Sequence, residues 1–203
     1  MGAKDIIVKP IQPSVGNAFV KSQHYSGKVV PNSQVHLGVF YAGKLEGVMQ
    51  FGPSLDKKKT QTLVSDTAWN GFIELNRMAF SSALLKNSEP RAIAIAMRHI
   101  RKNAKHIDWV ISFADATQCG DGTIYRASGF VLTGIKKNTG LRRNPETGEV
   151  IQNMVAFRRG IEKEFRGWPK MEGFQLRYVY FIKPDARKKL TVDEMPFSEI
   201  AKM

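Results

Sequence analysis

The chain has 203 residues, is 42% hydrophobic, and carries 31 Lys and Arg against 18 Asp and Glu, a net charge of +13. This length suits one domain with a core of ordinary size, and the positive charge favours a polyanionic partner such as a nucleic acid. The single cysteine, Cys119, excludes a disulfide within the chain. No segment approaches the ~18 apolar residues of a membrane span, and the first residues lack the apolar core of a signal peptide. We therefore expect a cytoplasmic protein with no membrane partner.

Apolar periodicity in the first half of the chain predicts a strand, a helix and three further strands. In chain order, these are a strand at Asp5–Pro10, a helix at Pro13–Tyr25, and strands at Val35–Tyr41, Leu45–Phe51 and Phe72–Phe80. The helix is expected to bury Val15, Ala18 and Phe19. The short connection through Gly43 predicts a hairpin between the first two of the three strands.

The second half begins with the longest predicted helix, Arg91–Lys105, with Ser88 as its cap and Pro90 near its first turn. The later expected elements are a strand at Trp109–Ala114, a short helix around Tyr125, and strands at Val131–Lys136, Ile151–Arg158 and Leu176–Ile182. A meander of three strands before the long helix argues against a doubly wound fold. We expect an α/β (α+β) domain over residues 1–182, with a mixed, mostly antiparallel central sheet flanked by helices, and a peripheral tail over residues 183–203.

Two sets of motifs resemble known families. The order of apolar strand, Gly-rich loop and Tyr125–Phe130 (YRASGF) is similar to the fourth-helix motif of GNAT acyltransferases. At finer scale, His24–Gly27, Glu74–Phe80 and Ser112–Phe130 resemble the Mom DNA-modification proteins of Mu-like phages, over most of residues 1–160. This resemblance implies a phage transferase that converts adenine N6 in double-stranded DNA to carbamoylmethyl (acetamido) adenine and so protects the DNA from host restriction.

Tyr125 and Asp115 are the first two catalytic candidates. A tyrosine phenol is neutral at pH 7 and can give a proton to a leaving group, although Tyr125 could equally pack in the core. Asp115 follows a buried strand at its carboxyl end, where α/β sheets tend to place ligands. It could orient or deprotonate an exocyclic amine, or it could cap a turn with Thr117. Asp121 is the expected cap of the next helix.

His24 and Tyr25 end the first helix. From the residues alone, His24 is more typical of a solvated side chain at a helix C-terminus, and Tyr25 of a ring packed on the sheet. The resemblance implies that His24 is a base or ligand and that Tyr25 stacks on the target base or relays a proton. The histidines show no metal-ligand spacing, so no metal is assigned. An iron site would require the fold to bring His24, Tyr25 and Asp115 together.

The donor side carries a departure from the GNAT pattern. GNAT proteins hold the pyrophosphate of CoA in a Gly-rich turn before the third helix, but Ser81–Arg91 contains no glycine. Pro90 also removes an amide donor, and Glu89 has the wrong charge for a phosphate. Ser88 and Arg91 remain candidates for donor binding, together with Glu74 and Arg77. The spacing of three along a strand predicts that Glu74 and Arg77 lie on opposite faces of the sheet and do not pair.

The acyl donor is therefore acetyl-CoA by resemblance to the superfamily, or glycyl-tRNA by the chemistry of the implied product. Transfer from acetyl-CoA would give an N-acetyl group. A glycyl group delivered to N6 could instead rearrange, because its amine can attack C6 and displace the amide. This route needs neither a reductant nor a metal, and it would make tRNA a second partner.

Basic residues in or near loops are the expected contacts with DNA phosphates. They are Lys57, Lys58, Lys59, Lys136, Lys137, Arg142 and Arg143. A flipped adenine could be held by Tyr25, Phe51 or Trp69. Two alternatives stay open at this point: a conventional CoA-dependent N-acetyltransferase acting on a protein or small amine, and a basic nucleic-acid-binding module on an inactive scaffold. The oligomeric state is also open, with a dimer as one option.

Overall fold

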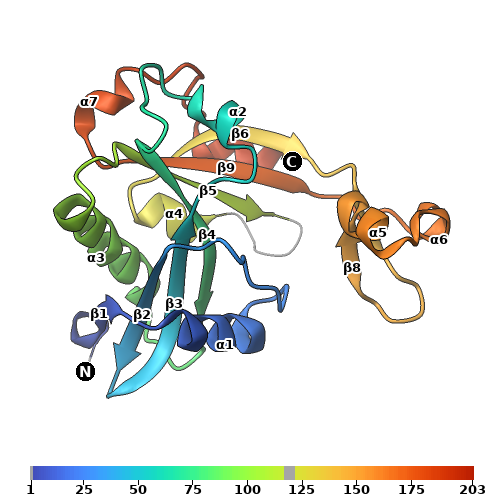
Figure 1. Ribbon diagram of the computed structural model, residues 1–203, viewed down its shortest axis with the longest axis horizontal. Helices are drawn as coiled ribbons and strands as arrows, with labels where there is room; N and C mark the ends of the chain where they lie inside the picture. Colours follow the sequence, from blue (N-terminus) through green and yellow to red (C-terminus); the bar gives the residue numbers. More distant parts are fainter. Residues whose placement is uncertain (1, 117–121) are drawn as a thin grey trace.

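The computed structural model describes residues 2–116 and 122–203 (Figure 1). Within them, a seven-stranded sheet has the order β1-β2-β3-β4-β5-β9-β6, and β7 and β8 form a separate hairpin. The strands are β1 (Ile7–Pro10), β2 (Val35–Tyr41), β3 (Lys44–Gly52), β4 (Phe72–Phe80), β5 (Trp109–Asp115), β6 (Val131–Lys137), β7 (Leu141–Arg143), β8 (Val150–Gln152) and β9 (Phe174–Phe181). Neighbouring strands of the large sheet are antiparallel except for β4 and β5, which are parallel. The sheet is thus mixed and mostly antiparallel, as predicted.

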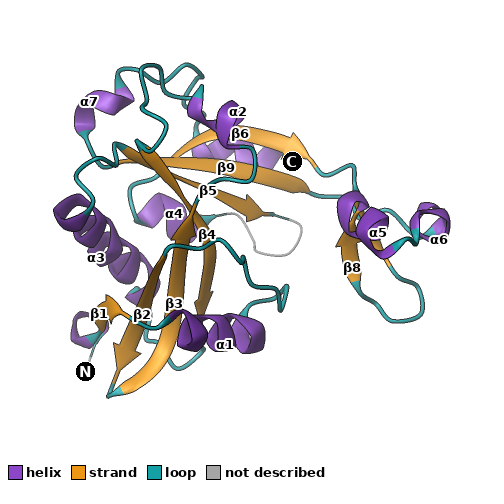
Figure 2. Ribbon diagram, viewed as in Figure 1, coloured by secondary structure: helices purple, strands orange, loops and turns teal. Residues whose placement is uncertain are grey.

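Helices cover both faces of this sheet (Figure 2). They are α1 (Pro13–Gln23), α2 (Lys57–Gln61), α3 (Ser88–Asn103), α4 (Thr123–Ala127), α5 (Asn153–Arg159), α6 (Glu162–Gly167) and α7 (Pro184–Arg187), with short 3-10 helices η1 (Ala3–Asp5) and η2 (Phe197–Lys202). Helix α3 buries Ile93, Ala96, Met97 and Ile100, the apolar face predicted from its sequence. These side chains form the main core with strand residues such as Leu75.

The first hairpin agrees closely with its prediction. Strand β2 has the expected bounds, and the turn to β3 runs through Ala42 and Gly43, whose φ angles are 48° and 79°. Two consecutive positive φ angles characterise the tight turn that suits the twist of a hairpin. The segment that contains Gly43 therefore determines the antiparallel pairing of these strands.

Two details of the predicted helices were wrong. Helix α1 buries Gly16 and Val20, whereas Val15 and Ala18 are exposed. Gly16 lies directly against the side chains of His36 and Gln50, so the helix approaches the sheet along its smallest residue. Ser88 is the first residue of α3 rather than its cap. The cap position is held by Asn87 in a left-handed conformation with φ of 68°.

The strand predicted at Ile151–Arg158 was also wrong, because most of that segment is helix α5. Gly160 ends this helix in the left-handed conformation (φ 68°) that glycine adopts readily. Residues 138–173, which we call the arm, comprise the β7–β8 hairpin, α5 and α6, and extend away from the main body (Figure 1). The arm has a small core of its own around Ile151, Ala156 and Phe165.

The segment after β9, expected as a peripheral tail, packs along the sheet. Ile200 belongs to the main core, and Ala186 to a second core beneath α7. The Met195 amide donates to the Leu132 carbonyl at 2.8 Å, which ties the tail to β6. Residues 183–203 therefore contribute buried surface to the same body as the strands. No helix among the described residues is long and apolar enough to cross a membrane.

Candidate functional site

The site lies where β4 and β5 separate. The two strands pair only from Phe72 with Trp109 to Leu75 with Ser112. Beyond that point a cavity of about 510 Å³ opens between them. The four residues assigned to catalysis from the sequence all line this cavity, namely His24, Tyr25, Asp115 and Tyr125. Arg77 and Glu89 line it as well.

The Tyr125 ring packs in the core, as one alternative expected, and the residue also lines the cavity. The ring stacks on Tyr178 at 4.6 Å and meets Phe130 edge-on at 5.3 Å. Its hydroxyl lies 2.9 Å from the hydroxyl of Ser112, a residue that the sequence analysis did not single out. The phenol is therefore held in a defined position at the cavity wall.

Asp115 ends β5 at the same cavity. Its Oδ1 accepts a hydrogen bond of 3.2 Å from the amide of Asn138, at the start of the arm. The carboxylate is thus oriented by a residue far along the chain. The alternative role with Thr117, the expected cap Asp121 and the single cysteine Cys119 lie outside the described residues.

His24 and Tyr25 stand side by side at the end of α1, with ring centroids 4.3 Å apart. The His24 Nδ1 lies 2.8 Å from the Ser26 hydroxyl. Burial, and secondly the charge of Arg77, lower the pKa of His24 to about 4. His24 is consequently neutral at pH 7.

Glu74 and Arg77 lie on the same face of the sheet, contrary to the prediction from their spacing. A β-bulge makes Leu75 pair with Phe51 but Arg77 pair with Gln50, so that Asn76 is an extra residue in β4. One extra residue reverses the alternation of side chains, and such bulges often occur beside active sites. The bulge places both Asn76 and Arg77 at the cavity. No sequence pattern signals it, because it depends on the pairing of two strands.

Arg77 also holds the segment that follows α1. Its Nε donates to the Lys28 carbonyl at 2.8 Å, and its Nη1 donates to the Asn76 carbonyl at 2.6 Å. Burial lowers the pKa of Arg77, while Tyr25 and Glu74 act in the opposite direction. Burial raises the pKa of Glu74, which is hydrogen-bonded to Ser54 and does not line the cavity.

The donor residues proposed around the start of α3 are not brought together. Ser88 is fully buried, and its hydroxyl has no hydrogen-bond partner among the described residues. Arg91 is exposed and reaches the Lys4 carbonyl at 3.5 Å. Neither residue lines the cavity, whereas the carboxylate-bearing Glu89 does. The residues present therefore do not fit the pyrophosphate of CoA in the way that a Gly-rich turn would.

The residues considered for an iron site, His24, Tyr25 and Asp115, all line this cavity. Within residues 2–116 and 122–203, however, no group of three or more His, Cys, Asp or Glu side chains is arranged to hold a metal ion.

The basic residues assigned to DNA lie in several places. Lys57, Lys58 and Lys59 form α2, and the Lys57 ammonium lies 4.7 Å from the centre of the exposed Trp69 ring. Lys136 and Lys137 end β6, next to the arm, and Arg143 is exposed on β7. Arg142 donates to the Trp168 carbonyl at 2.6 Å and therefore has a structural role in the arm.

Of the three aromatic residues considered for holding a flipped base, Phe51 is fully buried and cannot contact one. Tyr25 and Trp69 are each 54% exposed. Tyr25 lines the cavity and Trp69 does not.

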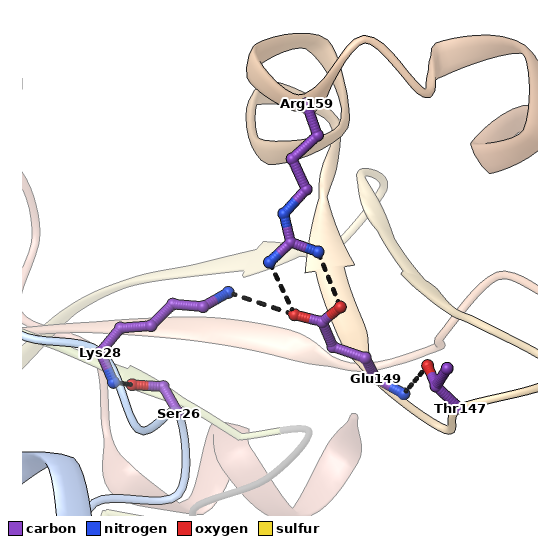
Figure 3. A network of polar contacts seen from close by, with 5 residues as sticks. All are labelled: Ser26, Lys28, Thr147, Glu149 and Arg159. Carbon is purple, nitrogen blue, oxygen red and sulfur yellow. Dashed lines mark hydrogen bonds and ion pairs between the residues drawn. The ribbon is translucent and has the colours of Figure 1, made fainter.

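An ion-pair network links the arm to the segment after α1 (Figure 3). Glu149 receives two hydrogen bonds from the Arg159 guanidinium, at 2.7 and 2.9 Å, and lies 3.8 Å from the Lys28 ammonium. Hydrogen bonding to Arg159 lowers the pKa of Glu149. Because the Lys28 carbonyl is bound by Arg77, this network connects α5 to the rim of the cavity.

Comparison with known proteins adds two findings. The model of the Mom protein family matches residues 5–199. The sequence is 35% identical over 198 residues to the protein named methylcarbamoylase mom of Escherichia phage Mu, covering 93% of this chain and 80% of that protein.

The fold is that of GNAT acetyltransferases. The spermidine/spermine N-acetyltransferase SpeG from Vibrio cholerae aligns with a TM-score of 0.55 at 8% identity, over 92% of this chain and 98% of that chain. The acetyltransferase yncA from Salmonella typhimurium, solved with acetyl-CoA, aligns with a TM-score of 0.53 at 9% identity, over 89% and 95%. A GNAT-family acetyltransferase from Desulfovibrio desulfuricans aligns with a TM-score of 0.51 at 12% identity, over 87% and 99%.

Proposed function

This chain belongs to the Mom protein family, and from that premise we propose that it is a phage transferase that converts adenine N6 in double-stranded DNA to carbamoylmethyl adenine inside the host cell. The phage Mu relative is named methylcarbamoylase, which supports modification with a group that contains a carbamoyl amide and one further carbon. The observation that carries the proposal is that one cavity brings together a neutral imidazole, a carboxylate and a phenol where β4 and β5 separate.

The first chemical step is acyl transfer to N6. The N6 nitrogen attacks the carbonyl carbon of the donor, a C–N bond forms, and the bond from that carbon to the leaving oxygen or sulfur breaks. His24 or Asp115 takes the proton from N6, and Tyr125 gives its proton to the leaving atom. Exposed Tyr25 stacks on the adenine after it leaves the duplex.

We favour a glycyl ester of tRNA as the donor. The product contains a nitrogen that an acetyl group cannot supply and a glycyl group can. After transfer, the glycyl amine attacks C6, the C6–N6 bond breaks, and the departing amide nitrogen takes the proton that the amine loses. The carboxylate of Glu89 lies at the cavity wall, where it would suit the ammonium group of such a donor.

Duplex DNA would be held by the exposed basic residues around the site. Lys136, Lys137 and Arg143 lie where the arm leaves the body, and Lys58 and Lys59 lie on α2. Such contacts bind phosphates without reading sequence. A net charge of +13 supports binding to both DNA and tRNA.

Incubation of the purified protein with duplex DNA and either acetyl-CoA or ¹⁵N-glycyl-tRNA tests this proposal. We expect carbamoylmethyl adenine only with glycyl-tRNA. Hydrolysis of its terminal amide should leave the label on the carboxymethyl adenine, because rearrangement joins the glycyl nitrogen to C6. A mass gain from acetyl-CoA alone would contradict the glycyl donor.

Variants test the assigned residues separately from the donor. Asp115→Asn and Tyr125→Phe should each lower modification by about 10²- to 10⁴-fold, the usual contribution of acid–base groups. Retention on DNA should stay unchanged. Tyr41→Phe, a tyrosine on β2 that does not line the cavity, is the matched control. Full activity in both site variants would show that the catalytic assignment is wrong.

A further inference from the structure

Ser112 occupies the point at which β4 and β5 part. It is fully buried and forms the last aligned pair with Leu75. Its Oγ lies 3.0 Å from the Leu75 carbonyl oxygen and 2.9 Å from the Tyr125 hydroxyl. The side chain thus joins the backbone of one separating strand to the phenol at the cavity wall.

The number of hydrogens decides the direction of these two bonds. A serine hydroxyl has one hydrogen, and a carbonyl oxygen can only accept. The arrangement that satisfies both contacts has Ser112 donating to Leu75 and Tyr125 donating to Ser112. In this state the hydrogen of the phenol points toward Ser112.

We infer that Ser112 is a positioning residue that stabilises Tyr125 after the phenol has given up its proton. This inference rests on the proposed role of Tyr125 as proton donor. To give up its proton, the Tyr125 hydroxyl first turns its hydrogen from Ser112 toward the leaving atom. As the O–H bond breaks and the proton moves to the leaving group, the Ser112 hydroxyl rotates and donates its hydrogen to the phenolate. Ser112 keeps its hydrogen throughout and changes only its acceptor, from the Leu75 carbonyl to Tyr125.

Contacts other than the one with Ser112 also hold the Tyr125 ring. The ring is already fixed by stacking on Tyr178 and by the edge contact with Phe130. Removing the Ser112 hydroxyl should therefore affect the charge on the phenol oxygen more than the place of the ring. A buried donor to an anionic oxygen is among the stronger hydrogen bonds in proteins.

Other charged and titratable groups surround Tyr125 and enter any pH profile. They are Asp115 on β5, Glu89 on α3, Arg77 on β4, His24 and Tyr25 after α1, Arg126 on α4 and Tyr178 on β9. Only variants compared within one profile can separate Ser112 from these groups.

The test compares Ser112→Ala with Ser128→Ala. Ser128 follows α4, and its hydroxyl donates to the Ile124 carbonyl at 2.7 Å. Ser112→Ala should lower the single-turnover rate on duplex DNA roughly ten- to a hundredfold at neutral pH. The alkaline limb of its pH–rate profile should move to higher pH, because the phenolate has lost its hydrogen-bond donor. Ser128→Ala should keep the wild-type rate and profile, and Ser112→Cys, which retains a weak donor, should fall between wild type and Ser112→Ala.

The double variant Ser112→Ala, Tyr125→Phe separates this role from a structural one. If Ser112 acts through Tyr125, the double variant should be no slower than Tyr125→Phe alone. A further drop, or an unchanged profile in folded Ser112→Ala, would overturn the inference. Full activity of Tyr125→Phe would instead contradict the proposed function, so the two failures are distinguishable.

Discussion

The two walls of the cavity differ in how they are held. The inner wall includes Asp115 and Tyr125 and belongs to the packed body, and Tyr125 is only 8% exposed. The outer wall consists of His24 and the 54% exposed Tyr25, and the segment that continues from it to Lys28 is attached through Arg77 and the Glu149 network. Apolar packing is strong and insensitive to salt, whereas exposed ion pairs are weak and screened. The inner wall is thus held mainly by packing, whereas the segment that continues from the outer wall is attached by polar contacts.

The largest effect is expected at the inner wall, from Gly122→Ala. Gly122 has a φ of +71°, and its missing Cβ would clash with the Tyr178 hydroxyl. Positive φ and overpacking together should lower the free energy of unfolding by about 2–5 kcal/mol. Urea unfolding measures this loss. Gly148→Ala, at a φ of +72° with no atom nearby, is the control and should show only the smaller backbone cost.

Arg77→Lys tests the attachment of the outer wall. A lysine ammonium cannot reproduce the two directed bonds that Arg77 makes to the Lys28 and Asn76 carbonyls. We expect a loss of about 1–3 kcal/mol in unfolding free energy and faster proteolysis within residues 24–34. Arg91→Lys, at an exposed position, should change neither measurement. If proteolysis within residues 24–34 were equally slow in Arg77→Lys and Arg91→Lys, the attachment through Arg77 would be contradicted.

His24 makes the outer wall sensitive to acid. Its pKa is about 4 in the folded protein, against the ordinary value of 6.5, so the unfolded chain binds more protons between these values. The contribution of His24 to stability is therefore present above pH 6.5 and is lost as the pH falls toward about 4. Thermal unfolding of His24→Gln across this window should show a shallower decline than wild type. An identical decline in His24→Gln and wild type would mean that the acid sensitivity arises from other groups.

The smallest effect is expected from Glu149→Gln, which removes the charge linking Lys28 and Arg159. Exposed ion pairs contribute little to stability, and salt screens them. The variant should lower modification slightly at low salt and match wild type at high salt. Glu146→Gln, in the same loop, should be neutral under both conditions. A salt-independent loss of activity would mean that Glu149 contributes more than its charge.

Local patterns predicted much of the fold and the four catalytic candidates that line the cavity. The β2–β3 hairpin, the apolar face of α3 and strand β5 followed from periodicity and turn residues. His24, Tyr25, Asp115 and Tyr125, identified by motif resemblance, proved to share one cavity. The strand expected at Ile151–Arg158 failed because a short apolar run is compatible with either a strand or a helix, and Gly160 ended it as a helix.

The donor side and the basic residues were less predictable. Ser88 and Arg91 do not line the cavity, and Glu89 does, because the position of α3 against the sheet decides which residue of its first turn faces inward. Glu74, on β4, does not line the cavity either. Arg142 was expected to bind DNA but bonds within the arm. A charged residue in a loop does not reveal its partner from sequence alone.

The sequence by itself determined the family, the fold class, the excess of positive charge and the residue types available for acid–base chemistry. The family follows from likeness along residues 5–199, and the other properties follow from composition and from patterns within a few residues. Only the tertiary structure decided that a bulge turns Asn76 and Arg77 toward the cavity and that Ser112 meets Tyr125 where two strands part. Such contacts depend on strand register and on residues far apart in the chain, which local periodicity does not encode.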